Sequence, residues 1–288
     1  MSNEERINYQ HYTPPHSDFL VYWTGKDIEA GLAPGSGAES LASTTDTATT
    51  DQYTKRLKSI LKYGLWMNDP DDEGEFCIAG HLGYRPVAPR VCFTELKLSE
   101  ARAHAARYGR LGIGFKRPFV VERGGLPVLY YPHWAGQWLR SIGRQTLTFG
   151  PKDIYACFLK RMGSGTRISY DYLNESEWRI VLAPWLEEKG YVTRPQNSKE
   201  FLDEHPATRE TDSQCPRYLL PVNSRWLALI IYPSIQAKHA AQEDPEVRQL
   251  LRAIKPSGHP GPVPPSETAP WEKFILPIEI ELDDCRNF

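Results

Sequence analysis

The chain has 288 residues, of which 40% are hydrophobic and 24% are charged, so it can bury a substantial core without disulfides or metals. Its formal net charge of -2 gives no overall attraction to nucleic acid. No run approaches the roughly 20 apolar residues of a membrane span, and the polar start lacks the pattern of a signal peptide. We therefore expect one soluble, cytoplasmic domain over residues 1–288.

Cysteine spacing argues against two further classes of protein. The five cysteines are scattered and include no CxxC pair, so they predict neither a disulfide framework nor a zinc site. The histidines likewise lack paired metal-ligand spacing. We expect reduced thiols and no metal.

Two segments have the composition of surface loops. Residues 33–50 contain one large apolar residue, Leu41, and predict a mobile loop. Residues 255–270 are rich in proline and glycine and predict an extended surface arm.

The first clear element in chain order is a helix between these segments. Its start is predicted at Asp51, which can cap the helix, and its end at Gly64. Four apolar residues recur at helical spacing between them: Tyr53, Leu57, Ile60 and Leu61.

The middle of the chain predicts short strands in quick succession. Arg90–Thr94 reads as a buried strand, and a helix follows that Ser99 begins and Gly109 ends. Three further strands separated by short turns predict an antiparallel meander: residues 113–116, 119–122 and 128–131.

The last third of the chain mixes both kinds of element. Apolar spacing predicts a helix over residues 154–162 and another that begins at Asp244-Pro245. Strands are predicted over residues 177–183, 226–232 and 278–282. Runs of strands with irregularly placed helices favour an α+β fold with a mainly antiparallel sheet over a doubly wound parallel sheet.

Six short motifs carry a resemblance that periodicity alone does not give. They are FLVYWTGKD at 19–27, ILKYGL at 60–65, RVCFTEL at 90–96, YGRLGIGFK at 108–116, PVLY at 127–130 and EWR at 177–179. Together and in this order, they resemble the AbiGi family of abortive-infection phage-resistance proteins, over about residues 20–231. The resemblance implies an antitoxin-like component of a defence system that binds a nucleotide, or a protein partner from the defence operon or the phage.

The same order of elements is also similar to the ADP-ribosyltransferase fold. That similarity implies a split sheet with peripheral helices, NAD as a substrate, and a cleft between the strand of Tyr22 and Thr24 and the strand that Glu177 opens. Glu177 would then stabilise the positive charge that develops on the ribose. The alternative is a purely structural role, in which Glu177 is an exposed charge paired with Arg179 or another basic residue.

The remaining site candidates would hold the nucleotide. Tyr22 and Thr24 would anchor the nicotinamide end, and Tyr108 or Tyr63 would stack on its ring. Thr94 and Arg110 complete the set of candidates for nucleotide binding. Tyr22 stands where many relatives and transferases have histidine, and this departure favours binding over catalysis.

The stretch from Glu95 to Arg123 has the strongest local positive charge. It contains seven basic residues and three acidic ones. A basic face over residues 97–123 would attract pyrophosphate, nucleic acid or an acidic partner; a solvated helix face with strand ends is the equal alternative. The sequence thus leaves three hypotheses: a binding component of phage defence, an active NAD-dependent ADP-ribosyltransferase, and a nucleic-acid-binding regulator.

Glycine-rich and acidic segments add no further site. Gly109-x-x-Gly112-x-Gly114 leads into a strand, whereas a dinucleotide-binding fingerprint opens a helix. Residues 163–166 lack the Gly-Lys-Ser/Thr ending of a phosphate-binding loop. The acidic residues between Asp69 and Glu75 lack the ligand spacing of a calcium loop.

Overall fold

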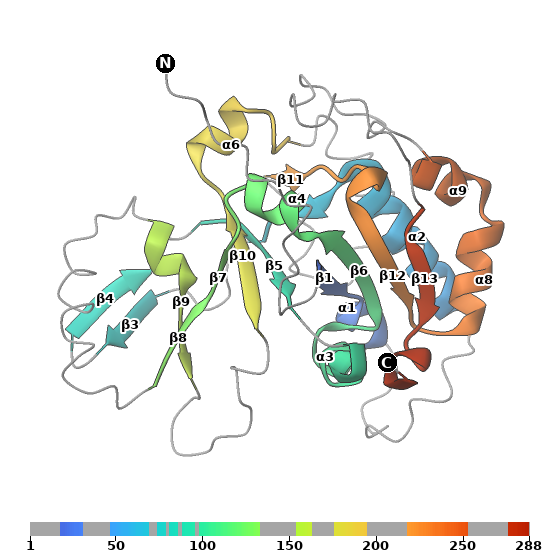
Figure 1. Ribbon diagram of the computed structural model, residues 1–288, viewed down its shortest axis with the longest axis horizontal. Helices are drawn as coiled ribbons and strands as arrows, with labels where there is room; N and C mark the ends of the chain where they lie inside the picture. Colours follow the sequence, from blue (N-terminus) through green and yellow to red (C-terminus); the bar gives the residue numbers. More distant parts are fainter. Residues whose placement is uncertain are drawn as a thin grey trace.

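A seven-stranded open sheet forms the centre of the protein (Figure 1). The computed structural model describes residues 18–30, 47–68, 74–78, 81–85, 88–95, 98–132, 154–162, 176–194, 218–252 and 276–287. The predicted surface arm at 255–270 and most of the predicted loop at 33–50 lie outside these ranges. Among the described residues, no helix is long and apolar enough to cross a bilayer.

The first strand of the chain lies in the middle of the main sheet, and the last strand forms one of its edges. The strands are, from edge to edge, β13 (Ile278–Glu281), β12 (Leu227–Tyr232), β6 (Leu111–Lys116), β1 (Phe19–Thr24), β5 (Arg90–Thr94), β10 (Glu177–Val181) and β7 (Leu126–Pro127). β12 and β13 pair in parallel, and the other neighbours pair antiparallel. The prediction of mixed helix and sheet is confirmed. The sheet is mixed in direction, and the transferase-like split is not confirmed.

Three small two-stranded sheets accompany the main one. β2 (Leu65–Trp66) pairs with β11 (Leu219–Leu220), and β3 (Gly74–Ile78) pairs with β4 (His81–Arg85). β8 (Leu129–Pro132) and β9 (Leu159–Met162) pair in parallel. Figure 1 shows these last two sheets beyond the β10 and β7 end of the main sheet.

Helices cover the two faces of the main sheet unequally. The larger core lies on one face, where β-strand side chains pack against α2 (Thr47–Tyr63), α4 (Arg117–Glu122), α6 (Pro184–Glu188), α8 (Ile235–Glu243) and α9 (Pro245–Arg252). On the other face, α3 (Ala101–Tyr108) covers Val21 and Trp23 of β1. Five short helices complete the described elements: α1 (Lys26–Ala30), η3 (Leu98–Glu100), η4 (Ile154–Phe158), η7 (Ser224–Trp226) and η8 (Asp284–Asn287).

Gly109 explains why the first and fourth motifs of the sequence come together. It ends α3 with φ 110° and ψ 159°, a conformation that is almost restricted to glycine. A Cβ here would lie 2.3 Å from the backbone nitrogen of Lys26 and 2.4 Å from the carbonyl oxygen of Thr24. The turn after α3 therefore packs directly on the turn after β1, where Lys26 Nζ also donates to the carbonyl of Ala106 at 2.6 Å.

The alternating glycines of β6 serve the packing of the α3 face. A Cβ on Gly112 would lie 2.9 Å from the ring of Trp23, and one on Gly114 would lie 2.9 Å from the Cβ of Leu229. Trp23 and Leu229 therefore pack directly against β6, where a residue larger than glycine would exclude them. On the other face, Ile113 and Phe115 enter the larger core.

Several predicted boundaries and elements are wrong. α2 begins at Thr47, so residues 47–50 are helical, and Asp51 lies inside the helix and pairs with Lys55. Ser99 does not cap α3, which follows η3 with Glu100 at its N-cap position. Residues 119–122 belong to α4, so the predicted meander is absent: β6 pairs instead with β1 and β12. Residues 154–162 form η4 and β9 in place of one helix.

Replacing Asp244 with alanine should lower the free energy of unfolding by about 1–2 kcal/mol. Its Oδ1 accepts from the backbone N–H groups of Glu246 at 2.9 Å and Val247 at 3.1 Å, which caps α9, and its Oδ2 lies 2.9 Å from Lys58 Nζ of α2. Urea denaturation measures the change. The control is Asp51→Ala, which removes an exposed pair within α2 and should matter far less; equal losses would contradict the capping role.

Candidate functional site

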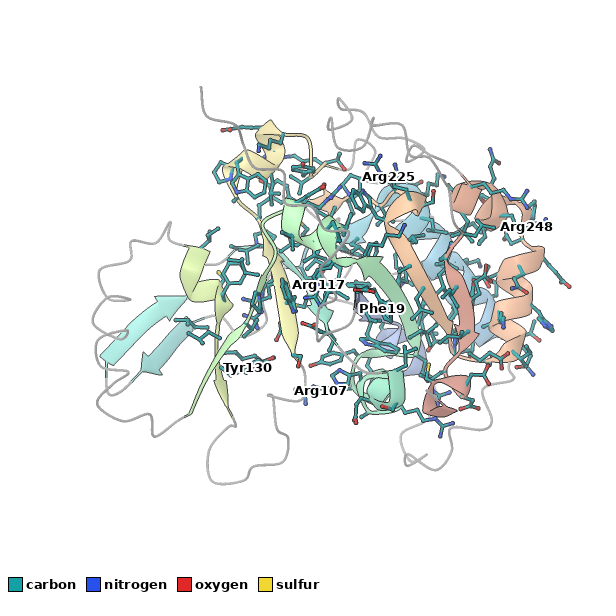
Figure 2. The ribbon with its side chains drawn as sticks, in the orientation of Figure 1. Phe19, Arg107, Arg117, Tyr130, Arg225 and Arg248 are labelled. Carbon is teal, nitrogen blue, oxygen red and sulfur yellow. The ribbon has the colours of Figure 1, made fainter. Side chains whose placement is uncertain are left out.

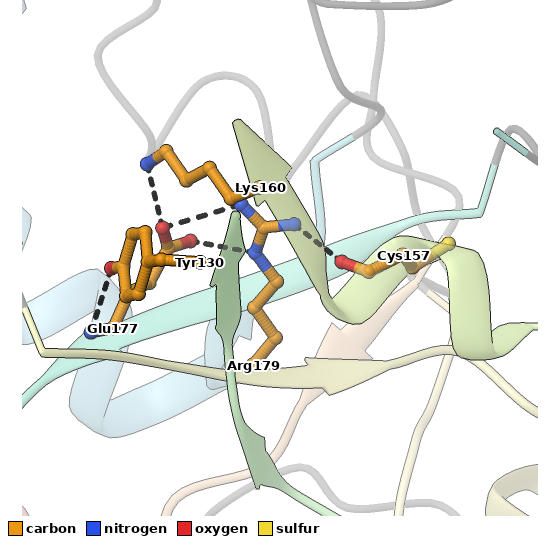
Figure 3. Close-up of polar contacts among 5 residues, drawn as sticks. All are labelled: Tyr130, Cys157, Lys160, Glu177 and Arg179. Carbon is orange, nitrogen blue, oxygen red and sulfur yellow. Dashed lines mark hydrogen bonds and ion pairs between the residues drawn. The ribbon is translucent and has the colours of Figure 1, made fainter. Parts of the chain in front are cut away.

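A buried carboxylate at the start of β10 gathers two basic side chains (Figure 3). Arg179 holds it through two bonds, Nε to Oε1 at 2.7 Å and Nη2 to Oε2 at 3.2 Å. Lys160 Nζ lies 2.7 Å from the same Oε2. The backbone N–H of Glu177 donates to the hydroxyl of Tyr130 at 3.1 Å, and Arg179 Nη1 donates to the carbonyl of Cys157. We call Tyr130, Cys157, Lys160, Glu177 and Arg179 the Glu177 cluster.

Four separate elements position the cluster, and one of them, η4, contributes the carbonyl of Cys157. Glu177 and Arg179 are two residues apart on β10, so strand alternation places both on one face. Lys160 comes from β9 and Tyr130 from β8, which pair in parallel and have Tyr130 and Lys160 opposite each other. The parallel pairing of β8 and β9 therefore carries both groups to the end of β10.

Opposing effects set the charge of Glu177. Burial alone would raise its pKa, but the charges of Arg179 and Lys160 and their hydrogen bonds outweigh burial and lower the pKa to about 2. The carboxylate is therefore ionised at neutral pH. Each of its oxygens already accepts at least one strong, charge-assisted hydrogen bond.

Beside the cluster, the sheet is open to solvent at Cys92. This residue pairs with Arg179 across β5 and β10, and Thr94 pairs with Glu177, so all four side chains share one face. Cys92 is exposed although β5 lies between β1 and β10. Desolvation by the surrounding protein and the nearby Glu177 carboxylate raise the pKa of its thiol to about 12. Cys92 is thus a neutral thiol at pH 7, a poor nucleophile.

Replacing Glu177 with glutamine should accelerate alkylation of Cys92 roughly 3- to 10-fold at pH 8.5, because the lost negative charge lowers the pKa of the thiol. The measurement is the labelling rate with a neutral thiol reagent in a chain whose Cys77 and Cys215 are serine. Cys157 and Cys285 are buried.

Glu95→Gln provides the matched control for this labelling experiment. The Glu95 carboxylate is also partly buried and ion-paired, but with Arg117, and it accepts from Trp178 Nε1 at 2.9 Å. Glu95 is not among the main causes of the raised pKa of the Cys92 thiol. An equal acceleration in both variants would indicate general loosening of the structure and contradict the electrostatic account.

The structure separates the site residues predicted from the sequence into two groups. Thr94 and Glu177 are cross-strand partners, and Thr94 also pairs with Val21 of β1. Tyr22 and Thr24 alternate with Val21 and face the larger core on the opposite side of the sheet. There Thr24 Oγ1 accepts from Arg56 of α2 at 2.9 Å, and Arg56 pairs with Asp27. Burial raises the pKa of Tyr22.

The other three candidates lie elsewhere. Tyr63 is the last residue of α2, with Lys62 Nζ 5.0 Å from its ring centre. Tyr108 ends α3 and packs against His104 and Arg107. Arg110, half-buried, follows the turn at Gly109. The structure therefore does not bring the predicted set together on one face, and their roles in nucleotide binding stay predictions.

The basic stretch at 97–123 does not form one continuous face in its described part. α3 precedes β6 and α4 follows it, so their basic residues lie at opposite ends of a strand roughly 20 Å long. Figure 2 shows Arg107 beside α3 and Arg117 well apart from it. Arg123 is buried, with its guanidinium 4.0 Å from the ring centre of Phe119. Arg102 pairs with Asp283.

Sequence reasoning missed most partners of Glu177. The pairing of Glu177 with Arg179 could be predicted, because residues two apart on a strand share a face. The sequence suggested an exposed pair, whereas the structure buries it. Tyr130 lies in the PVLY motif but has no signal that assigns it a role. Lys160 lies in a segment predicted as a helix, and the exposed position of Cys92 depends on which helices cover the sheet.

The described residues contain no group of three or more histidine, cysteine or acidic side chains that could hold a metal ion. The Glu177 cluster offers an ionised carboxylate, two cations and a phenol, and Cys92 beside it adds a neutral thiol. This set is suited to polar and charged recognition.

Comparison with known proteins gives one match. Residues 81–148 match the family model described as "Putative abortive phage resistance protein AbiGi, antitoxin". No curated protein and no solved structure matches, so the comparisons lend no support to the ADP-ribosyltransferase resemblance. The matched span contains β5, α3, β6 and α4, with the RVCFTEL, YGRLGIGFK and PVLY motifs. The predicted resemblance of this chain to the AbiGi family is thus confirmed over residues 81–148.

Proposed function

We propose that this protein is an antitoxin-like binding component of an abortive-infection defence system, and that it binds through the sheet face beside the Glu177 cluster. The family match at residues 81–148 supports the defence role. It includes Cys92 and Thr94, the β5 residues of this face, whereas Glu177, Arg179 and Lys160 come from later in the chain.

The state of the Glu177 carboxylate is the observation that favours binding over transfer. A transferase of this type needs a carboxylate available to a ribose hydroxyl, next to donors that hold the nicotinamide. Here both carboxylate oxygens already bind Arg179, and one also binds Lys160. Tyr22 and Thr24, which were predicted to hold the nicotinamide, face the other side of the sheet.

The experiment is a growth-rescue assay with the neighbouring genes of the operon. Those genes expressed without this chain should stop growth, because an antitoxin is absent, and co-expression of the wild-type chain should restore it. Neighbouring genes that are harmless alone, or toxicity that this chain does not relieve, would contradict the proposal.

A variant of the cluster sharpens the growth-rescue assay. Glu177→Gln should weaken rescue, because it leaves Arg179 and Lys160 without their shared anion and changes the charge of the binding face. Lys238→Gln is the control: Lys238 pairs with Glu281 at the β13 edge and has a similar exposed fraction to Lys160. Immunoblotting checks that both variants accumulate to the wild-type level.

A further inference from the structure

The face beside the Glu177 cluster has more positive than negative charge. Arg90 and Arg179 both act on the thiol of Cys92, and Lys160 joins them from β9. The carboxylate of Glu177 is the negative group that acts with them. Arg179 and Lys160 bind the carboxylate, and Arg90 lies on the same face two residues before Cys92 on β5. The three cationic side chains outnumber the one carboxylate, and their excess positive charge is opposite in sign and equal in size to the charge of a phosphate dianion.

The side chains differ in their freedom to meet a ligand. Arg179 is locked, since its guanidinium binds Glu177 and the carbonyl of Cys157, and its side chain is 4% exposed. Lys160 is 20% exposed and carries its charge on a flexible stem with three donors. Lys160 can therefore turn toward a ligand, while Arg179 contributes charge from a fixed position and Arg90 from a buried one.

The two β5 residues of this face, Cys92 and Thr94, carry no negative charge that would repel an anion. Cys92 is exposed, and its thiol is neutral at pH 7. Thr94 adds a hydroxyl on the same face, aligned with Glu177. Over the neighbouring strand β1, the same face is covered by α3, which packs on Val21 and Trp23.

From this arrangement we infer that the open sheet face at Cys92 is a phosphate-binding site, with Lys160 as the direct contact and Arg179 and Arg90 as buried positive charges. The inference rests on the proposed function, since it names the chemical group that the binding face takes. The ligand is inorganic phosphate or the phosphate of a small nucleotide, and the two share the same recognition.

Protection of Cys92 from a neutral thiol reagent tests the site, in the full chain with Cys77 and Cys215 replaced by serine. Inorganic phosphate or ADP should slow labelling at least fivefold in a saturable manner, at constant ionic strength. Adenosine should not. Stronger protection by ADP than by phosphate would identify a nucleotide site, and equal protection a site for phosphate alone; both support the inference.

Three lysine variants separate specific binding from general screening. Lys160→Gln should abolish protection, Lys160→Arg should retain it, and Lys238→Gln should behave as wild type. Absence of saturable protection in the wild type, equal protection by adenosine, or undiminished protection in Lys160→Gln would overturn the phosphate site. Growth rescue is scored separately: rescue without phosphate protection removes only this inference, whereas failed rescue with intact protection removes only the antitoxin role.

Discussion

Replacing Arg179 with alanine should lower the free energy of unfolding by about 3–5 kcal/mol, the usual loss when one partner of a buried ion pair is removed. The Glu177 side chain is 9% exposed in the wild type, and in the variant its carboxylate would have Lys160 as its remaining cationic partner in the cluster. The carbonyl of Cys157 would also lose its donor. Urea denaturation followed by circular dichroism measures the change.

The matched control is Arg194→Ala, at another pair of arginine and glutamate. Arg194 lies 3.0 Å from Glu187, but its side chain is 66% exposed. Water replaces the lost contact there, so the stability should change little. Similar losses in the two variants would show that burial does not set the energetics of the Glu177 cluster.

Acid denaturation tests the ion pair of Glu177 and Arg179 by protonating the carboxylate. The pKa of Glu177 falls from its ordinary 4.5 to about 2 in the folded protein. Its stabilising contribution is therefore complete above about pH 4.5 and is lost as the pH falls toward 2. The wild type should lose more stability across this window than Glu177→Gln, which has no carboxylate to protonate.

Replacing Gly109 with alanine should destabilise the protein by about 3 kcal/mol or more, from backbone strain together with overpacking. The φ angle of 110° disfavours any residue with a Cβ, and the added atom would lie 2.3 Å from the Lys26 nitrogen. Backbone atoms, unlike a flexible side chain, cannot turn aside. Thermal unfolding measures the loss.

Gly112→Ala tests whether the close backbone approach explains the loss at Gly109. A Cβ at Gly112 meets the ring of Trp23 at 2.9 Å, and this side chain can shift. Gly112→Ala should therefore destabilise less than Gly109→Ala. The reverse order would contradict the account of how the turns after β1 and α3 pack.

Local patterns were sufficient to predict much of the fold. β5 matches its predicted range, α2 ends before Gly64, and α9 follows Asp244, because caps, glycines and apolar spacing act within a few residues. The three apolar residues at 119–121 fit either element, and Pro118 is as suitable at the first turn of a helix as in a turn between strands.

The candidate site depended on information that is not local. The face on which a strand side chain lies follows from register, and one residue of slip exchanges the faces. The pairing of Val21 with Thr94 places Tyr22 away from Glu177, and no pattern within either strand specifies that register. Lys160 reaches the site through the parallel pairing of β8 and β9, which joins segments about thirty residues apart.

Nicotinamide release from NAD is the measurement that tests most directly whether this protein works by binding. The purified wild-type chain and Glu177→Gln are each incubated with labelled NAD and cell extract. If Glu177 serves as a held anion in a binding face, both proteins should release nicotinamide at the background rate and transfer no label. Release by the wild type that Glu177→Gln abolishes, with Glu95→Gln unaffected, would contradict the account and establish a transferase.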